Sequence, residues 1–322
     1  MGKALPTQDK LVVLAEWLQV GPDELRFGKA AAGARLSDAQ FEPLGMADRE
    51  MIHRYLAMTV GALILIQVAT AFSKIKSLGK TPFWASLGLL FLVCVQGAFG
   101  AWTVTLKLQP IIVTIHLMLA LVLLACLTVY AQQAWEQDAS SIHTLRIRPL
   151  PAQLLLIAFV VLAIQIFLGA WVSTNYAVLA CPDFPTCLGA AWPETNWGEG
   201  FTLWRQLGLN AQGEFISPIA LQTIHWAHRL FAVAVLIVLS MLSWKALRLA
   251  TPVLSGLSRF AKLLLALLLL QVITGISNVV FQWPLLAALL HTAGSAALVF
   301  CLVRMSSWAS WSSSLHKNMA KL

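Results

Sequence analysis

The chain has little charge and few cysteines. Of its 322 residues only 11% are Asp, Glu, Lys or Arg, whereas 59% are hydrophobic, a balance far more apolar than that of a water-soluble globular protein. Five cysteines are too few to build a disulfide-dense scaffold. A phosphate-binding loop, a nucleotide-binding pattern and a hydrolytic triad motif are also absent from the sequence. We therefore expect lipid to surround most of this chain.

Long apolar runs predict an all-α membrane protein. A membrane-spanning helix needs about 20 mostly apolar residues. Seven stretches meet that length, at 52–73, 83–104, 110–131, 151–173, 217–243, 260–281 and 284–304.

The net charge of +8 would suit nucleic-acid binding, but the positions of the basic residues favour membrane topology instead. Lys and Arg gather in three connections, at Lys74, Lys76, Lys80, Arg146, Arg148, Lys245, Arg248 and Arg259. The positive-inside rule places these connections and the C-terminus in the cytoplasm. The other connections, including the long segment 174–216, then face outward. Strict alternation also puts the polar segment 1–50 outside, although it contains no signal peptide.

Four histidines repeat at equal spacing. A His-Arg pair occurs near the outer start of two helices, at His53 and His228, and 63 residues separate each from a second outer-side histidine, His116 or His291. The helix between them carries Gln and Gly four residues apart, as Gln96 and Gly100 and as Gln271 and Gly275, and Gln165 and Gly169 precede His228 in the same way. We interpret this pattern as a duplicated bundle.

The duplication favours a metal-binding role for the histidines. One histidine inside a membrane is often only a satisfied interior hydrogen-bonding group. Four at duplicated positions, two in each half, instead predict two axial pairs for haem iron, which imidazole nitrogen suits well. Copper binding or a proton relay would use the same residues. Small residues such as Gly97, Gly100 and Gly275 would leave room for a flat macrocycle, or would serve ordinary close helix packing.

Neighbours of these histidines suggest further roles. Arg54 and Arg229 are candidates for pairing with haem propionates, and snorkelling to the interface is the alternative. Glu50 lies three residues before His53, whereas His225 takes that place before His228. A carboxylate beside one site only would suit proton-coupled chemistry there and electron transfer at the other. A helix-dipole role for Glu50 is the alternative.

The outer loop carries a cysteine pair. Cys181 and Cys187 have five residues between them and lie in a compartment that permits disulfides. A structural disulfide is expected, with a redox or metal-relaying pair as the alternative. Trp192, Trp197 and Trp204 in the same loop suit an aromatic belt or a lid.

Several strings resemble those of the haem A synthase family, from about Glu50 to the C-terminus. They are EMIHRYLA, QGAFGAWTVTLKL, QIFLGAWVSTNYAVLACPDFPTC and IHWAHRLFA. The resemblance implies two pseudosymmetric four-helix bundles that oxidise the C8 methyl of haem O to the formyl group of haem A for cytochrome oxidase assembly. It also implies that His53 and His116 hold the substrate haem, that Glu50 assists catalysis, and that His228 and His291 ligate a haem b cofactor.

The sequence departs from that family at its front. No counterpart of the family's first transmembrane helix or first outer-loop cysteine pair precedes Glu50. Residues 5–28 faintly resemble the closing helices of a repressor domain, without a recognition helix, so no DNA binding is expected. We thus expect a polar segment 1–50, an incomplete three-helix substrate-haem unit at 51–149 and a four-helix haem b unit at 150–322. Activity would then be impaired.

Two other functions use the same residues. One is a membrane electron carrier of the cytochrome b type, which would need no Glu50, and the other is an inactive truncated homologue. The expected location is the bacterial inner membrane, with the haem sites toward the outer side. The expected partners are haem O and the lipid bilayer, and further candidates are haem O synthase, an electron-transfer partner and a second copy of the chain.

Overall fold

The computed structural model describes residues 46–138 and 150–310, and these form an all-α protein, as predicted. Seven of its helices are long and apolar enough to cross a membrane. They are α3 (Met46–Ser73), α5 (Thr81–Thr105), α6 (Pro110–Asp138), α7 (Ala152–Thr174), α9 (Pro218–Leu249), α10 (Ser255–Val280) and α11 (Leu285–Met305). The predicted segment 1–50 lies largely outside the described residues.

The remaining elements are short. They are α4 (Ile75–Leu78), η3 (Ala177–Leu179), α8 (Trp197–Gly200), η4 (Pro252–Leu254), η5 (Ser306–Trp308), β1 (Leu150–Pro151) and β2 (Ala309–Ser310). Strands β1 and β2 pair in parallel and join the start of α7 to the end of α11.

Proline and serine set where the membrane helices begin. Helix α9 starts with Pro218 in its first turn, where a missing backbone N–H costs nothing. Ser217 caps this helix, because its hydroxyl accepts a hydrogen bond from the amide of Ala220 at 3.1 Å. Helix α6 likewise begins at Pro110, the residue predicted from the end of the preceding polar connection.

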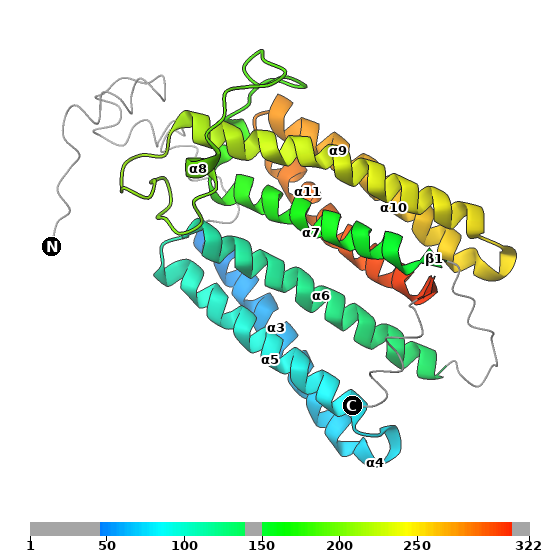
Figure 1. The fold of residues 1–322 in the computed structure, drawn as a ribbon. Helices are drawn as coiled ribbons and strands as arrows, with labels where there is room; N and C mark the ends of the chain where they lie inside the picture. The colour runs from blue at the N-terminus through cyan, green and yellow to red at the C-terminus, as the bar shows by residue number, and fades with distance from the viewer. Residues whose placement is uncertain (1–45, 139–149, 311–322) are drawn as a thin grey trace. The chain divides into compact units, whose positions relative to one another are not determined.

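Two units divide the chain by internal contacts, Met1–Leu63 and Ile64–Leu322, and each is considered separately. The predicted division into bundles at 51–149 and 150–322 stays a prediction. Within the second unit, α7, α9, α10 and α11 lie alongside one another (Figure 1). Their shared core takes four buried residues from each helix, and in α7, α9 and α10 these are three or four residues apart. The residues are Leu155, Ala158, Leu162, Ile166; Val235, Leu239, Leu242, Ala246; Leu257, Ala261, Leu264, Leu268; Leu298, Cys301, Leu302, Met305.

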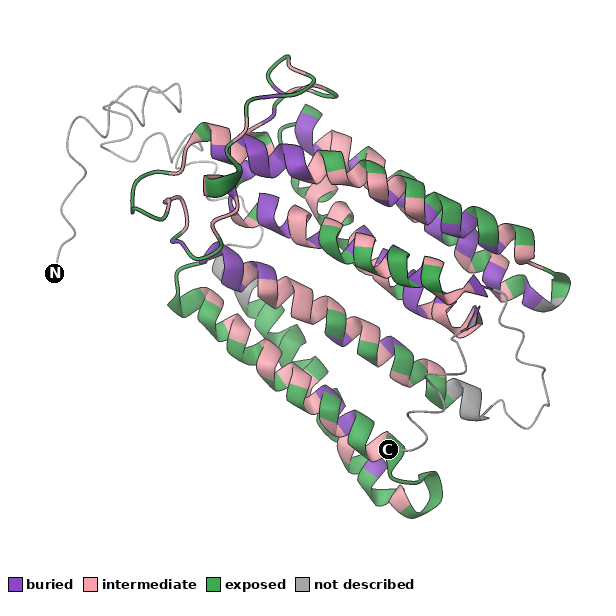
Figure 2. Cartoon of the chain, in the orientation of Figure 1, coloured by how far each residue is buried: buried purple, intermediate pink, exposed green. Residues whose placement is uncertain are grey.

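Helices α5 and α6 pack against each other, and α6 also contacts α7 and α11. A smaller core of Ile64, Leu89 and Leu123 holds the end of α3 to this pair. Large apolar side chains remain exposed on the outer faces of the helices, as at Phe91 and Leu286. Such a surface requires a hydrocarbon environment. Figure 2 shows buried residues concentrated at the start of α9, beneath the loop between α7 and α9.

Candidate functional site

Three histidines in the second unit share one local arrangement. In each case a glutamine on a neighbouring helix donates a hydrogen bond to the histidine's main-chain carbonyl, and a glycine one turn later faces the imidazole ring. The histidines are His116, His228 and His291. The Gln and Gly spacing noticed in the sequence therefore has a structural reason, because both residues contact a histidine.

The pair α10 and α11 presents His291. The Nε2 atom of Gln271 donates to the carbonyl oxygen of His291 at 3.1 Å. A Cβ atom at Gly275 would lie 3.3 Å from Cε1 of that ring, so only glycine leaves the ring comfortable space. Thr274 Oγ1 lies 2.9 Å from the ring's Nδ1.

The pair α7 and α9 presents His228 in the same way. Gln165 Nε2 lies 3.3 Å from the carbonyl oxygen of His228 and 3.1 Å from its Nδ1. A Cβ atom at Gly169 would approach Cε1 of the ring to 2.9 Å. This contact is the tightest of the three, and a larger residue would force the ring to move.

The pair α5 and α6 presents His116. Gln96 Nε2 donates to the carbonyl oxygen of His116 at 2.9 Å and lies 3.5 Å from its Nε2. A Cβ atom at Gly100 would lie 3.1 Å from Cε1. Gly97, by contrast, has nothing within 4 Å of such an atom, so of the two glycines only Gly100 contacts the ring.

The structure brings His228 and His291 together as a facing pair. Their ring centroids are 6.4 Å apart and the rings are inclined at 75°. Imidazole nitrogens bind first-row metals at about 2 Å, so two imidazoles on opposite sides of one metal ion have ring centres roughly 6 Å apart. The observed spacing fits an axial pair.

The donor set favours haem iron over a metal ion held by protein alone. Among residues 46–138 and 150–310, no three His, Cys, Asp or Glu side chains gather into a metal-binding group. A structural metal ion usually takes four protein ligands. A porphyrin supplies the equatorial ligands itself and asks the protein only for axial ones. Two facing histidines on packed helices meet that need.

Three other predicted residues, Glu50, His53 and Arg54, belong to the first unit. His53 and Arg54 are on the part of α3 that belongs to the first unit, and the pairing of His53 with His116 stays a prediction. Glu50 is in α3, and its side chain lies outside the described residues. Its catalytic role stays a prediction too.

Arg229 donates hydrogen bonds to the loop that carries the Cys181–Cys187 pair, which we call the cysteine loop. Its guanidinium donates to the carbonyl oxygens of Cys181 at 2.6 Å, Asp183 at 2.7 Å and Thr186 at 2.9 Å. Its Nε donates to Nε2 of His225 at 3.1 Å. The predicted disulfide between Cys181 and Cys187 is formed, with Cα atoms 4.7 Å apart. Contact of Arg229 or His225 with propionates stays a prediction.

Asp183 organises the turn inside this loop. Its carboxylate accepts hydrogen bonds from the Thr186 hydroxyl and from the amides of Gly189 at 3.0 Å and Leu188 at 2.6 Å. These bonds, that of Thr186 above all, hold the pKa of Asp183 at about 2, below its ordinary value of 3.8. Together with the disulfide and Arg229, they fix the loop over the N-terminal end of α9.

Comparison with known proteins identifies the family of this chain. Residues 40–303 match the family model of the cytochrome oxidase assembly proteins named COX15-CtaA. The chain belongs to this family. Among curated relatives, a heme A synthase of Shewanella oneidensis is 36% identical over 80% of this chain and 74% of its own length. A heme A synthase of Rhizobium rhizogenes is 31% identical over 78% of this chain and 65% of its own.

A third relative, a heme A synthase of Halalkalibacterium halodurans, is 29% identical over 44% of this chain and 47% of its own length. The chain thus spans between about half and three quarters of these relatives. All four histidines of the repeat lie inside the segment that matches the COX15-CtaA family.

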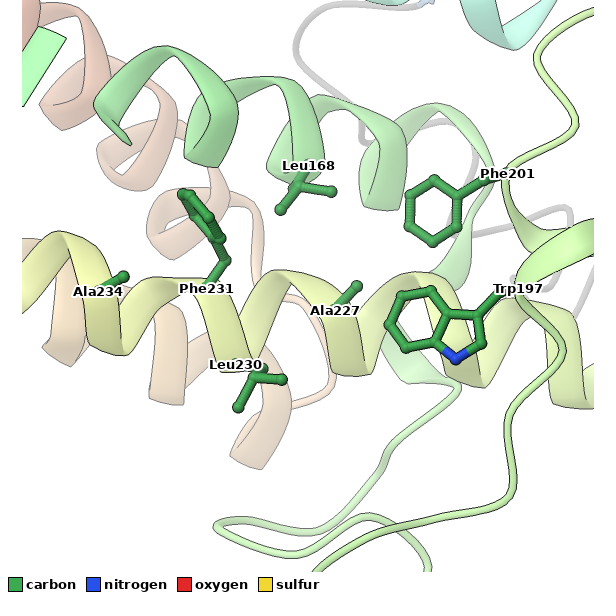
Figure 3. A pocket seen from close by; sticks show the side chains of 7 residues that line it. All are labelled: Leu168, Trp197, Phe201, Ala227, Leu230, Phe231 and Ala234. Atoms are coloured by element: carbon green, nitrogen blue, oxygen red, sulfur yellow. The ribbon is translucent and has the colours of Figure 1, made fainter. Parts of the chain in front are cut away.

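An apolar cavity of about 560 Å³ lies beside α7 and α9 (Figure 3). It is lined by Leu168, Trp197, Phe201, Ala227, Leu230, Phe231 and Ala234. The lining residues that the structure describes carry no titratable group, and none of the four repeated histidines is among them. Trp197, predicted as part of a belt or lid, forms one wall.

Sequence reasoning missed two polar residues near the outer end. Arg205 is 4% exposed, donates to the side chain of Asn175, and lies with its guanidinium 5.8 Å from the ring centre of Trp171. Burial lowers the pKa of Arg205. Thr274 was missed as well, although its position three residues after Gln271 and one before Gly275 is visible in the sequence.

Proposed function

We propose that this chain is a haem A synthase that oxidises the C8 methyl group of haem O to the formyl group of haem A. Family membership and the names of the curated relatives support the proposal. The observation that carries it is the facing pair of His228 and His291, spaced as two axial imidazoles would be. The enzyme would thereby serve cytochrome oxidase assembly.

We assign different roles to the two pairs of histidines. His228 and His291, in the predicted bundle 150–322, hold a haem b cofactor. His53 and His116, in the predicted bundle 51–149, hold the substrate haem. His116 has the same glutamine and glycine contacts as His228 and His291, which supports a role for His116 as a haem ligand. Arg54 and Arg229, with His225 behind Arg229, are the candidates for contact with propionates.

The conversion R–CH3 + H2O → R–CHO + 4 H+ + 4 e− takes its oxygen atom from water and releases four protons and four electrons from the methyl carbon and that water. A bound haem b supplies one-electron transfer to an external acceptor. Glu50, one helical turn before His53, accepts protons as the methyl group is oxidised.

The enzyme would lie in the bacterial inner membrane with its haem sites toward the outer side. The basic connections at Lys74, Lys76 and Lys80 and at Arg248 and Arg259 support a cytoplasmic location for those ends of the helices. The cysteine loop would then lie in an oxidising compartment, consistent with its disulfide. Haem O synthase is a partner that would deliver the substrate.

A membrane cytochrome b is the second candidate, because the same facing pair of histidines would serve an electron carrier. The test is to express the full chain in cells that make haem O but no haem A, and to separate the extracted haems by chromatography. A synthase yields haem A, whereas an electron carrier yields only bound haem b. Glu50→Gln should keep haem b and lose haem A. Haem b without haem A in the unmodified chain would overturn the proposal.

A further inference from the structure

The hydroxyl group of Thr274 connects helix α10 to the imidazole of His291. Thr274 is only 4% exposed. Its Oγ1 lies 2.7 Å from the carbonyl oxygen of Leu270, one turn back on the same helix, and 2.9 Å from Nδ1 of His291. The contact to Leu270 is the common back-bond of a helical threonine.

The chemistry of the three groups fixes which one donates. A carbonyl oxygen only accepts, so the single hydroxyl proton of Thr274 goes to Leu270. The remaining contact then requires Nδ1–H of His291 to donate to a lone pair of the hydroxyl oxygen. A neutral imidazole carries one N–H, and with that proton on Nδ1 the Nε2 atom of His291 keeps a free lone pair.

We propose that Thr274 is a positioning residue that sets the tautomer and ring orientation of His291 so that Nε2 is ready to bind haem iron. The inference rests on the proposed function of His228 and His291 as axial ligands. Metal-binding histidines commonly donate their second ring N–H to such an acceptor, which fixes the ring and makes it a stronger ligand.

This device is specific to one of the three arrangements. The residues in the position of Thr274, three after each glutamine, are Phe99 and Leu168 in the others. Glutamine amides approach the other two rings, with Gln96 Nε2 at 3.5 Å from Nε2 of His116 and Gln165 Nε2 at 3.1 Å from Nδ1 of His228. Within the pair assigned to the cofactor, Thr274 thus gives His291 a hydroxyl contact that neither Phe99 nor Leu168 can supply at the matching position.

The test replaces the hydroxyl with a methyl group of the same shape. In Thr274→Val the purified full-length protein should bind haem roughly 10-fold to 100-fold more weakly. Because the hydrogen bond favours the ferric form, the midpoint potential should rise, by about 59 mV for each tenfold difference between ferric and ferrous affinity. Thr274→Ser keeps the hydroxyl and should restore both values.

Thr128→Val is the matched control. Thr128 is also buried, and its hydroxyl also donates one turn back, to the carbonyl oxygen of Leu124 at 2.7 Å. This bond stays within α6 and involves no histidine. The control should keep the unmodified affinity and potential. If Thr274→Val does not accumulate, Thr274→Ala removes the same hydroxyl and serves in its place.

The outcomes separate this inference from the proposed function. If the unmodified protein shows no low-spin haem, the assignment of His228 and His291 fails and the role of Thr274 fails with it. If the unmodified protein binds haem and Thr274→Val has the same affinity and potential, only the inference is overturned. It is also overturned if Thr128→Val shifts these values equally, or if Thr274→Ser behaves like Thr274→Val.

Discussion

The helix pairs α5–α6 and α10–α11 use the same two contacts to hold a histidine, yet they surround its ring differently. In both, a glutamine reaches the histidine carbonyl and a glycine faces the ring. At His291 a threonine hydroxyl takes Nδ1, whereas Phe99 occupies the matching position beside His116. The glutamine and glycine contacts common to both pairs position the imidazole ring. The residues that differ between the pairs give each ring different hydrogen-bond partners.

Two connections in the second unit also differ in length. Residues 106–109 join α5 to α6, whereas residues 175–217 join α7 to α9 and carry the disulfide. The long loop closes over the end of α9 that carries His225, His228 and Arg229. This loop belongs to the half that we assign to the cofactor.

The largest expected effect comes from removing a ligand of the facing pair. His228→Ala or His291→Ala should abolish the low-spin six-coordinate haem spectrum of the purified protein, because each removes one of two axial nitrogens. His116→Ala should keep that spectrum and lose haem A formation. The measurement is an absorbance spectrum of oxidised and reduced protein. Survival of the spectrum in both single variants would end the axial assignment.

The glycines offer a graded test of ring contact. Gly169→Ala should weaken haem binding most, since its Cβ would lie 2.9 Å from the His228 ring, and Gly275→Ala less, at 3.3 Å. Overpacking of this kind costs about 1–3 kcal/mol, roughly a factor of 10 or more in affinity. Gly97→Ala is the control, with nothing within 4 Å. Haem titration should reproduce this order, and an equal effect of all three would show that the contacts do not matter.

A smaller effect is expected from Arg229, which holds the cysteine loop. Arg229→Ala removes the donors to three loop carbonyls, and each acceptor left unpaired costs about 1–3 kcal/mol where water cannot replace the donor. The disulfide should then be reduced roughly tenfold more readily, measured by alkylation of Cys181 and Cys187 at low reductant concentration. Arg248→Ala, at the far end of α9, should leave that protection unchanged. If the disulfide of Arg229→Ala resists reduction as well as that of the unmodified protein, Arg229 does not hold the loop in place.

The smallest effect concerns the pH dependence of the same loop. The pKa of Asp183 is lowered to about 2 by its hydrogen bonds, so the carboxylate stabilises the loop above its ordinary pKa of 3.8, and that contribution is lost as the pH falls toward 2. Hydrogen exchange of the Leu188 and Gly189 amides should accelerate over that range relative to other loop amides. Asp183→Asn should remove the pH dependence. A wild-type profile that stays flat would show that the carboxylate does not hold the turn.

Much of the fold was predictable because lipid imposes simple rules. A membrane helix needs a long apolar run, and the predicted segment 110–131 begins where α6 begins, while 217–243 differs from the start of α9 by one residue. Helix ends were harder, since α9 continues to Leu249 through basic residues that hydropathy does not count as membrane. The disulfide was predicted correctly from spacing and compartment.

By itself the sequence determined the seven helices, the repeated histidines and the Gln and Gly pairs, because apolar length and equal spacing are properties of the chain written in one dimension. Only the tertiary structure decided that His228 and His291 face each other. It also decided that the Arg229 guanidinium donates to the loop carbonyls and that the Thr274 hydroxyl contacts Nδ1 of His291. These contacts join residues on different helices or distant in the chain, and helix rotation and side-chain direction set them. The spacing of residues along the sequence does not specify helix rotation or side-chain direction.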